Sequence, residues 1–160
     1  TATVITVRKP LLTITKYVRN DTPATTFNPG VADITVDGID YYAAGVTGNP
    51  GDTMQYLIVI DNSAAGAGVA SNIVVSDPIP QFTSYQAGTI ELDATGTGTF
   101  VAQGDGDTTD AAEHDSGNRI VYVYAGAGGS AGAAGFGNGT GGSLNGGEIS
   151  YIRFDVVIDN

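Results

Sequence analysis

The sequence predicts an all-β protein folded as an antiparallel β-sandwich, and three observations support this prediction. The chain has 160 residues, the size of one ordinary domain. No stretch of ten or more residues places apolar side chains at the three- and four-residue spacing of an amphipathic helix. Short runs of β-branched and aromatic residues, separated by Gly, Pro, Asn and Asp, occur instead. Several short strands with no helices between them are typical of a sandwich.

The strongest apolar runs predict six strands, at residues 12–18, 54–60, 72–75, 88–92, 119–124 and 149–158. Weaker runs predict five more, at residues 3–7, 34–36, 39–42, 82–85 and 99–102. All of these fall within the roughly 3–10 residues that are usual for strands.

Two of the strong runs alternate in a way that indicates one buried and one solvent-facing side. In the last run the expected buried set is Ile152, Phe154, Val156 and Ile158, and the opposite set is Arg153, Asp155 and Asp159. In the first run a lysine shares the apolar side, which consists of Leu12, Ile14, Lys16 and Val18.

Residues 125–147 are dominated by Gly, Ala and Ser and are expected to join the last two strands as a loop. One interpretation is a flexible surface loop. The alternatives are a compact loop folded on itself and a loop that packs against a neighbouring chain.

Charge and composition favour an extracellular protein that binds neither nucleic acid nor membranes. The chain has 17 acidic and 6 basic residues, a net charge of −11, so phosphate backbones and anionic lipid headgroups should repel it. No apolar run approaches the 18 or so residues that a membrane span needs. Cys is absent and Met occurs once, so few side chains are easily oxidised. No basic and apolar leader precedes Thr1, so we expect a mature chain.

A motif at residues 49–89 resembles a known family. It contains a Pro-Gly-Asp turn, a strand with Tyr, an Asn at the end of that strand and a Val-rich strand closing in Asp-x-Ile-Pro. The matching residues are Pro50, Gly51, Asp52, Thr53, Tyr56, Asn62, Val74, Val75, Asp77, Pro78, Ile79, Pro80 and Tyr85. These features are similar to those of the bacterial and archaeal surface-protein repeat called domain of unknown function eleven.

The resemblance covers residues 11–160 loosely and leaves residues 1–10 as an N-terminal extension. The segments 21–48 and 125–147 are longer than the family norm. The resemblance implies an immunoglobulin-like sandwich that occurs in extracellular proteins, usually as one of many tandem repeats, and it implies no enzyme activity.

The motif also has a physical explanation. Pro50 and Gly51 are suited to a turn, and the Asp52 carboxylate can accept a hydrogen bond from the backbone there. Pro78 and Pro80 cannot donate ladder hydrogen bonds, so they should end the preceding strand. These residues specify a fold and supply no catalytic group.

The residues for nucleophilic catalysis are nearly missing, so we expect no enzyme. His114 is the sole histidine, and there is no Cys to pair with it. It lies in the acidic stretch DAAEHDSG, where we expect an exposed, solvated side chain.

An acidic loop offers a candidate site for Ca²⁺, the one cofactor that the sequence suggests. Carboxylates on a Gly-containing loop are the ligands that this cation prefers. The candidate ligands are Asp105, Asp107, Asp110, Glu113 and Asp115. Their spacing is not that of an EF-hand, and the alternative is a solvated acidic loop.

Lys16 suggests a second candidate site, because a lysine on an apolar face must extend to water or pair with another group. Some immunoglobulin-like surface domains form an isopeptide bond there. Asn160 falls in the inward register of the last strand and is the candidate partner, with Asp61 or Asp77 as the assisting acid.

The N-terminal run TATVITV predicts a strand ahead of the domain, and the following Pro10 interrupts pairing. One interpretation is an ordinary first strand of the same sandwich. The other is a strand donated to the sheet edge of a neighbouring copy. In that case the subunit-interface residues are Thr3, Val4, Ile5, Thr6 and Val7.

Three functions follow as hypotheses. The first is a structural subunit of an extracellular filament or sheath, a homopolymer joined by the donated strand and in contact with other cell-surface components. The second is a spacer repeat of a large surface adhesin. The third is a Ca²⁺-dependent glycan-binding module that uses exposed aromatic residues such as Tyr41 and Tyr42.

Overall fold

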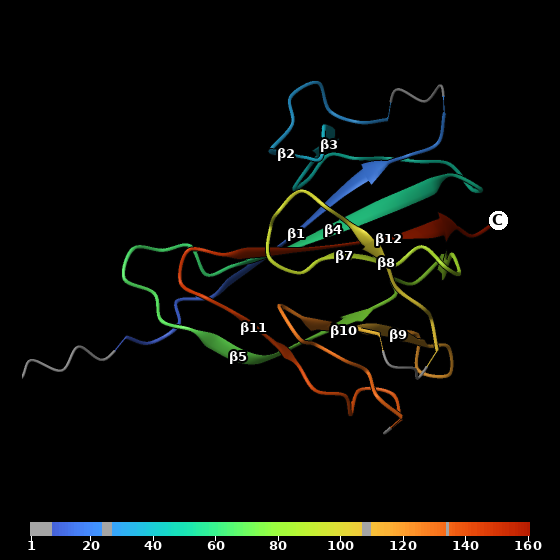
Figure 1. The fold of residues 1–160 in the computed structure, drawn as a ribbon. Helices are drawn as coiled ribbons and strands as arrows, with labels where there is room; N and C mark the ends of the chain where they lie inside the picture. The colour runs from blue at the N-terminus through green and yellow to red at the C-terminus, as the bar shows by residue number, and fades with distance from the viewer. Residues whose placement is uncertain (1–7, 24–26, 107–109, 134) are drawn as a thin grey trace, which may run out of the picture.

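The structure is a computed structural model that describes residues 8–23, 27–106, 110–133 and 135–160. The regular elements among these residues are twelve strands in antiparallel sheets (Figure 1). This confirms the predicted all-β sandwich. Within the same residues, nothing forms a helix of the length and apolar character that a bilayer span requires.

One layer is a six-stranded sheet centred on the long pair β4 and β12. Its main path runs β1, β4, β12, β7, β8, and β6 pairs with the other end of β12. The strands are β1 (Thr13–Asn20), β4 (Thr53–Asp61), β12 (Ile149–Ile158), β7 (Glu91–Asp93), β8 (Val101–Ala102) and β6 (Thr83–Tyr85). In the register, Lys16 lies opposite Ile58, and Ile58 lies opposite Ile152.

The second layer is a four-stranded sheet with the order β11, β5, β10, β9. Its strands are β11 (Gly142–Leu144), β5 (Ala70–Pro78), β10 (Ile120–Ala125) and β9 (Ala112–Asp115). The main core lies between the two sheets. Its fully buried members include Ile60, Leu144, Val121, Ile152 and Phe154.

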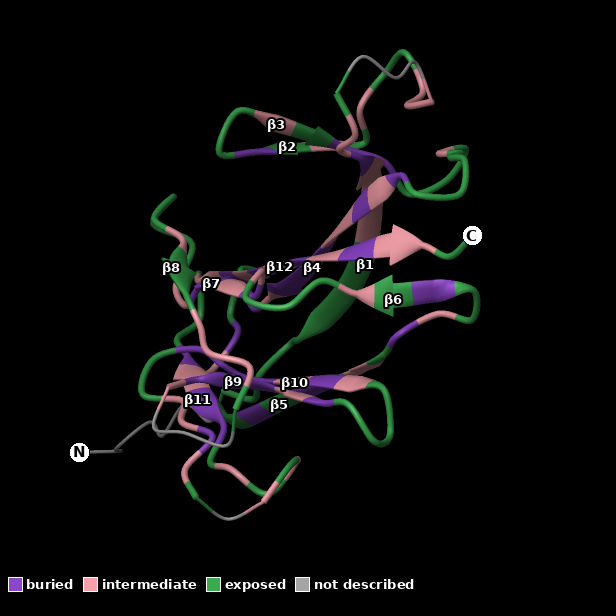
Figure 2. Ribbon diagram, turned by 90° about the vertical axis from the view of Figure 1, so that its right-hand side faces the viewer, coloured by how far each residue is buried: buried purple, intermediate pink, exposed green. Residues whose placement is uncertain are grey.

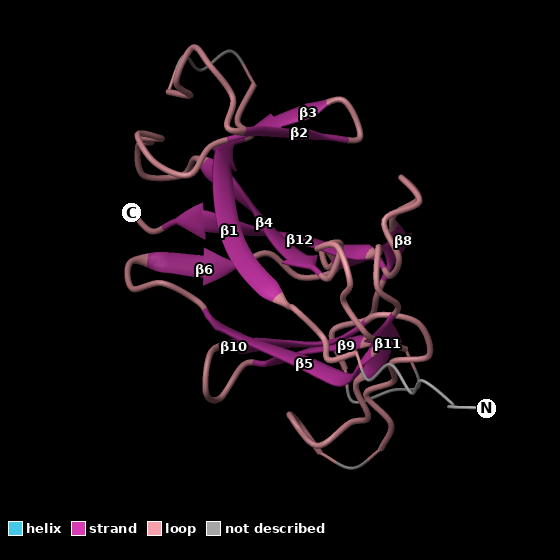
Figure 3. Ribbon diagram, turned by 90° about the vertical axis from the view of Figure 1, so that its left-hand side faces the viewer, coloured by secondary structure: helices cyan, strands magenta, loops and turns pink. Residues whose placement is uncertain are grey.

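A short hairpin, β2 (Ile34–Val36) and β3 (Ile39–Tyr41), forms a third layer outside the six-stranded sheet (Figure 3). Its turn residues Asp37 and Gly38 both have positive φ, the conformation that an Asp-Gly hairpin turn requires. The hairpin and the sheet enclose a second core of Val36, Tyr41, Leu57 and Val59.

The hairpin corrects two expectations from the sequence. Tyr41 and Tyr42 are 0% and 7% exposed, so the aromatic pair expected to face a glycan is buried. The outer side of β12, expected to face water, is half-covered, and the Arg153 guanidinium stacks 3.8 Å from the centre of the Phe100 ring.

All six strongly predicted strands are present; the run at 149–158 has the predicted bounds and the other five have shifted ends. The run at 72–75 extends over Ala70–Pro78, and the run at 88–92 begins at Glu91. The predicted strand at 3–7 lies outside the described residues. β9 and β11 carry none of the β-branched or aromatic residues on which the prediction relied, so they were missed.

The Gly-rich segment 125–147 is a compact loop folded on itself, which corrects the interpretation as a flexible loop. β11 lies within it and pairs with β5, and Ala127 and Ser130 form bridges with Ser143 and Thr140. Ala131 is fully buried. Glycine at position 129 lets the loop lie directly on the sheet, since a side chain there would collide with the Tyr124 carbonyl.

Asn62 joins four segments at the end of the sandwich where β4 stops. Its side chain is fully buried, and its Oδ1 accepts a hydrogen bond from the Leu11 amide (3.1 Å). Its Nδ2 lies within donating distance of the carbonyls of Gly68 (2.8 Å), Leu144 (3.1 Å) and Asn145 (3.1 Å). A buried polar group with partners on several segments fixes their relative positions.

We predict that Asn62→Ala lowers the free energy of unfolding by at least about 2 kcal/mol, because buried backbone groups lose their partner. Urea denaturation of the variant measures this change. Asn145→Ala is the control, since the Asn145 side chain bonds Glu148 at the exposed surface and its loss should cost within about 0.5 kcal/mol. Equal stabilities of the two variants would contradict the role assigned to Asn62.

Candidate functional site

The first half of β1 points apolar side chains toward the interior, yet leaves them in water. Ile14 lies on the same side of β1 as Val18, which packs against the main core, but Ile14 is 62% exposed. Leu12, just before the strand, is 42% exposed. Figure 2 shows β1 in the exposed colour over this half. An inward-facing isoleucine this exposed indicates that the opposite sheet does not extend beneath it.

The edge of the opposite sheet ends below β1. β11 pairs with β5 only between Ala70 and Ile73. The stretch of β5 from Val74 to Pro78 pairs with β10 on one side, and no described strand pairs with its other side. Val74 is 41% exposed there.

The outer edge of β1 is also free. Val18 exchanges both backbone hydrogen bonds with Tyr42 across this edge (2.9 and 3.0 Å). In an antiparallel ladder every second residue directs its backbone groups to the same edge, so Ile14 and Lys16 share this edge with Val18. Within the described part of the chain no strand pairs with them there.

These features enclose a hollow surface that we call the β1–β5 groove. It consists of two adjoining hollows of about 320 and 210 Å³. The first lies between Leu12–Ile14 and Ser71–Val74, and the second between Lys16 and Val74–Asp77. Ile60 and Ile58 contribute to the floor of the first and second hollows. Each hollow exceeds the roughly 150 Å³ in which an apolar cavity binds benzene.

An ion pair marks one end of the groove. Lys16 Nζ donates to both Asp77 carboxylate oxygens (2.9 and 2.6 Å), so it connects β1 to β5 across the two sheets. The same ammonium lies 4.0 Å from the centre of the Tyr56 ring. Burial and the charge of Asp77 raise the pKa of Tyr56, which keeps its hydroxyl protonated. The lysine predicted on the apolar side of β1 is therefore paired.

The opposite side of the sandwich is lined by polar side chains around a hollow of about 270 Å³. The rings of Tyr85 and His114 lie 4.0 Å apart, and the Tyr85 hydroxyl donates to Asp105. Arg119 donates to the carbonyls of Pro80 (2.9 Å) and Thr83 (2.6 Å). The two openings between the sheets therefore differ in character, and at the β1–β5 side the exposed Leu12 and Ile14 lie at free strand edges.

The chain enters the domain beside the open end of the groove. The Gly68 amide donates to the Lys9 carbonyl (2.7 Å), and the Leu11 amide donates to Asn62. A side chain at Gly68 would lie 2.5 Å from the Arg8 carbonyl, so glycine is needed for this contact. Residues 8–11 thus cross the end of the sandwich and lead away from the groove. The predicted interface residues Thr3, Val4, Ile5, Thr6 and Val7 lie outside the described residues.

The structure does not bring Lys16 and Asn160 together. Lys16 lies level with Ile152 through the register of β1, β4 and β12. Asn160 is eight residues further along, roughly 26 Å at the rise of an extended chain. Of the two acids considered, Asp77 contacts Lys16, as an ion pair.

The acidic residues predicted to bind Ca²⁺ have separate partners in the chain. Glu113 is fully buried on β9, where its Oε1 accepts hydrogen bonds from the Tyr124 hydroxyl (2.5 Å) and the Gly137 amide (2.6 Å). Burial and the bond to Glu113 raise the pKa of Tyr124 to about 12. Asp115 accepts from the backbone of the following turn (3.0 Å).

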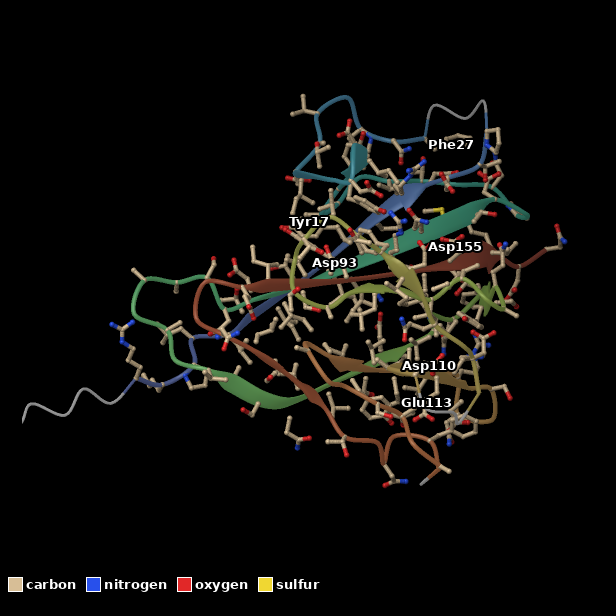
Figure 4. All side chains as sticks on the ribbon, viewed as in Figure 1. Tyr17, Phe27, Asp93, Asp110, Glu113 and Asp155 are labelled. Atoms are coloured by element: carbon tan, nitrogen blue, oxygen red, sulfur yellow. The ribbon has the colours of Figure 1, made fainter. Side chains whose placement is uncertain are left out.

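The other acidic candidates cap turns as well. Asp105 accepts from Tyr85 and from the Gly88 amide, and Asp110 accepts from the Gly104 amide. Figure 4 places Asp110 and Glu113 on the side of the four-stranded sheet. Asp107 lies outside the described residues. In the part of the chain that is described, no three His, Cys, Asp or Glu residues form a group that could hold a metal ion, so Ca²⁺ binding stays a prediction.

Sequence patterns found half of the groove. The alternation of residues 12–18 placed Ile14 and Lys16 on the inward side, which the structure confirms. Val74 was assigned to a strand, but its exposure at a free edge was missed. Whether that edge is free depends on how far β11 extends along β5, and β11 has no apolar pattern that would reveal it.

We predict that His114 makes the stability depend on pH. It is half-buried on β9 rather than exposed in a loop, and burial lowers its pKa below the usual 6.5. The folded protein therefore binds a proton at His114 less readily than the unfolded chain does, so stability present above pH 6.5 is lost as the pH falls. The melting temperature of His114→Gln should fall less between pH 8 and pH 5 than that of the original chain. Equal falls would contradict this assignment.

The motif that resembles the surface-protein repeat forms β4, β5, β6 and their turns. The Asp52 carboxylate accepts a hydrogen bond from the Asn49 amide (2.9 Å), and β5 ends at Pro78. Both features agree with the physical explanation of the motif. Comparisons with protein families, with curated proteins and with solved structures found no match. The family assignment stays a prediction.

Proposed function

We propose that this chain is a structural subunit of an extracellular filament or sheath. Its copies form a homopolymer in which residues 1–7 of one copy are donated to the next. The observation that carries the proposal is the β1–β5 groove, which combines exposed aliphatic side chains with free strand edges. Such an edge binds an extended segment through main-chain hydrogen bonds, and the pockets beside it accept alternate side chains.

The geometry of the chain supports assembly into an open polymer. The donated segment departs from the end of the domain at Arg8, whereas the groove is a different surface beside β1 and β5. A contact between two different surfaces leaves one of each kind unused at the ends of any assembly. Such contacts extend into a filament when the rotation between copies does not close a ring.

Composition supports a location outside the cell. The chain lacks Cys, contains one Met and carries a net charge of −11, which suits a soluble surface exposed to oxidants and other cell-surface components. Polar side chains of the motif bond to the backbone of its turns, as the Asp52 carboxylate does to the Asn49 amide. We therefore propose a structural role.

We predict that the purified full chain forms polymers and that the chain lacking residues 1–7 does not. Removing the segment should leave the domain intact, because the contacts of Lys9 and Leu11 remain. Sedimentation and negative-stain microscopy measure the assembly, and circular dichroism checks that the truncated chain keeps its strands. A full chain that stays monomeric would contradict the proposal and favour a spacer repeat. Polymers formed by the truncated chain would show that the segment is not the link.

A further inference from the structure

We infer that the β1–β5 groove is the acceptor site and that its occupant is residues 3–7 of a second copy, with Ile5 and Val7 filling the two hollows. This inference rests on the proposed function and adds to it the acceptor edge and the inward face of the donated strand. Three observations support it: the matching lengths of the segment and the groove, the alternation of side chains along the segment, and the path of residues 8–11.

The segment and the groove have matching lengths. The β1 side extends from Leu12 to Lys16, roughly 13 Å at 3.3 Å per residue, and the β5 side extends from Ser71 to Asp77, roughly 20 Å. Residues 3–7 in a strand span about 13 Å on the same scale. A five-residue strand therefore fits between the open end and the Lys16–Asp77 ion pair.

Alternation determines which side of the strand enters. Thr3, Ile5 and Val7 share one side of an extended chain, and Val4 and Thr6 share the other. The side with Ile5 and Val7 is the larger apolar one. Neighbours on one side of a strand lie about 6.6 Å apart, and the two adjoining hollows share Ile14 and Val74 as common walls. Ile5 and Val7 therefore match two hollows placed side by side.

The path of residues 8–11 favours a neighbour's groove over the chain's own. Arg8 precedes Leu12 by four residue steps, so it lies at most about 13 Å from Leu12. The segment between them is hydrogen-bonded to Gly68 and Asn62. If the segment turned back at Arg8, Val7 would lie one residue from Arg8 and so outside the groove. Ile5 and Val7 could then not fill both hollows. A second copy has no such restriction.

The groove also supplies partners for the backbone of the donated strand. Ile14 and Lys16 direct backbone groups to the free edge of β1, and Val74–Pro78 forms the free edge of β5. A strand between these edges extends a sheet by main-chain hydrogen bonds while its side chains cover Ile14. A single donated strand thus pairs with a free strand edge and also covers the exposed Ile14 side chain.

The donated side is tested in the full chain by Ile5→Asp and Thr6→Asp, which add the same charge at neighbouring positions. Ile5→Asp should weaken assembly at least about tenfold in the concentration needed, because it places a carboxylate in an apolar hollow. Thr6→Asp, on the outward side, should assemble within about twofold of the original chain. If Thr6→Asp weakened assembly as much as Ile5→Asp or more, the inward side assigned to the strand would be wrong.

The acceptor is tested by Ile14→Asp, with Leu12→Asp as a second variant. Both side chains are already exposed, so the folded domain should tolerate the changes, and circular dichroism checks that it does. Each variant should lose assembly at least about tenfold. Val101→Asp is the matched control, since Val101 is an exposed strand valine outside the groove, and it should assemble normally. Normal assembly of the folded Ile14→Asp and Leu12→Asp chains would overturn the acceptor assignment.

Mixing the Ile5→Asp and Ile14→Asp chains distinguishes a wrong acceptor groove from a wrong filament proposal. The Ile5→Asp chain keeps a working groove, and the Ile14→Asp chain keeps a working donor, so an equimolar mixture should form one-to-one pairs that do not grow. Absence of such pairs while the original chain polymerises would overturn the groove and leave the filament intact. Closed dimers of the original chain that both variants disrupt would support the groove and overturn the filament.

Discussion

An apolar side chain that points into a sandwich is stabilised only when the opposite layer removes it from water. The six-stranded sheet extends past the four-stranded sheet at β1, so Ile14 points inward but remains 62% exposed. On the other side of the molecule the equivalent opening is lined by the Tyr85–His114 stack and the Arg119 hydrogen bonds. The two openings therefore differ in polarity, and the proposed assembly depends on the apolar groove at free strand edges.

Asn62 connects that groove to the route by which the chain leaves the domain. Its side chain bonds the Leu11 amide and the carbonyls of Gly68 and Leu144, so the entry of β1, the start of β5 and the end of β11 are held at one place. The same residue therefore positions both sides of the groove and directs residues 8–11 across the end of the sandwich. Asn62 therefore both stabilises the fold and determines the direction of residues 8–11.

The sequence predicted the long strands well because their signal is local. Alternation in 12–18 and 149–158 correctly placed Ile14 and Phe154 on the inward side, and Pro78 correctly ended β5. The third layer, the folding of the Gly-rich loop and the burial of Tyr41 depend on which segments meet in three dimensions. No residue pattern near Val74 shows that β11 stops pairing at Ile73. The β5 side of the groove therefore became visible only in the structure.

Cross-linking between two labelled copies tests the central claim most directly. The natural chain has no Cys, so a chain with Ile5→Cys and a chain with Ile14→Cys each carry a single thiol, and a disulfide between them reports contact of the two positions. The account predicts a rapid link between unlike chains under mild oxidation, and little linkage when Phe82→Cys, at an exposed residue outside the groove, replaces Ile14→Cys. Equal linkage to both positions would contradict it.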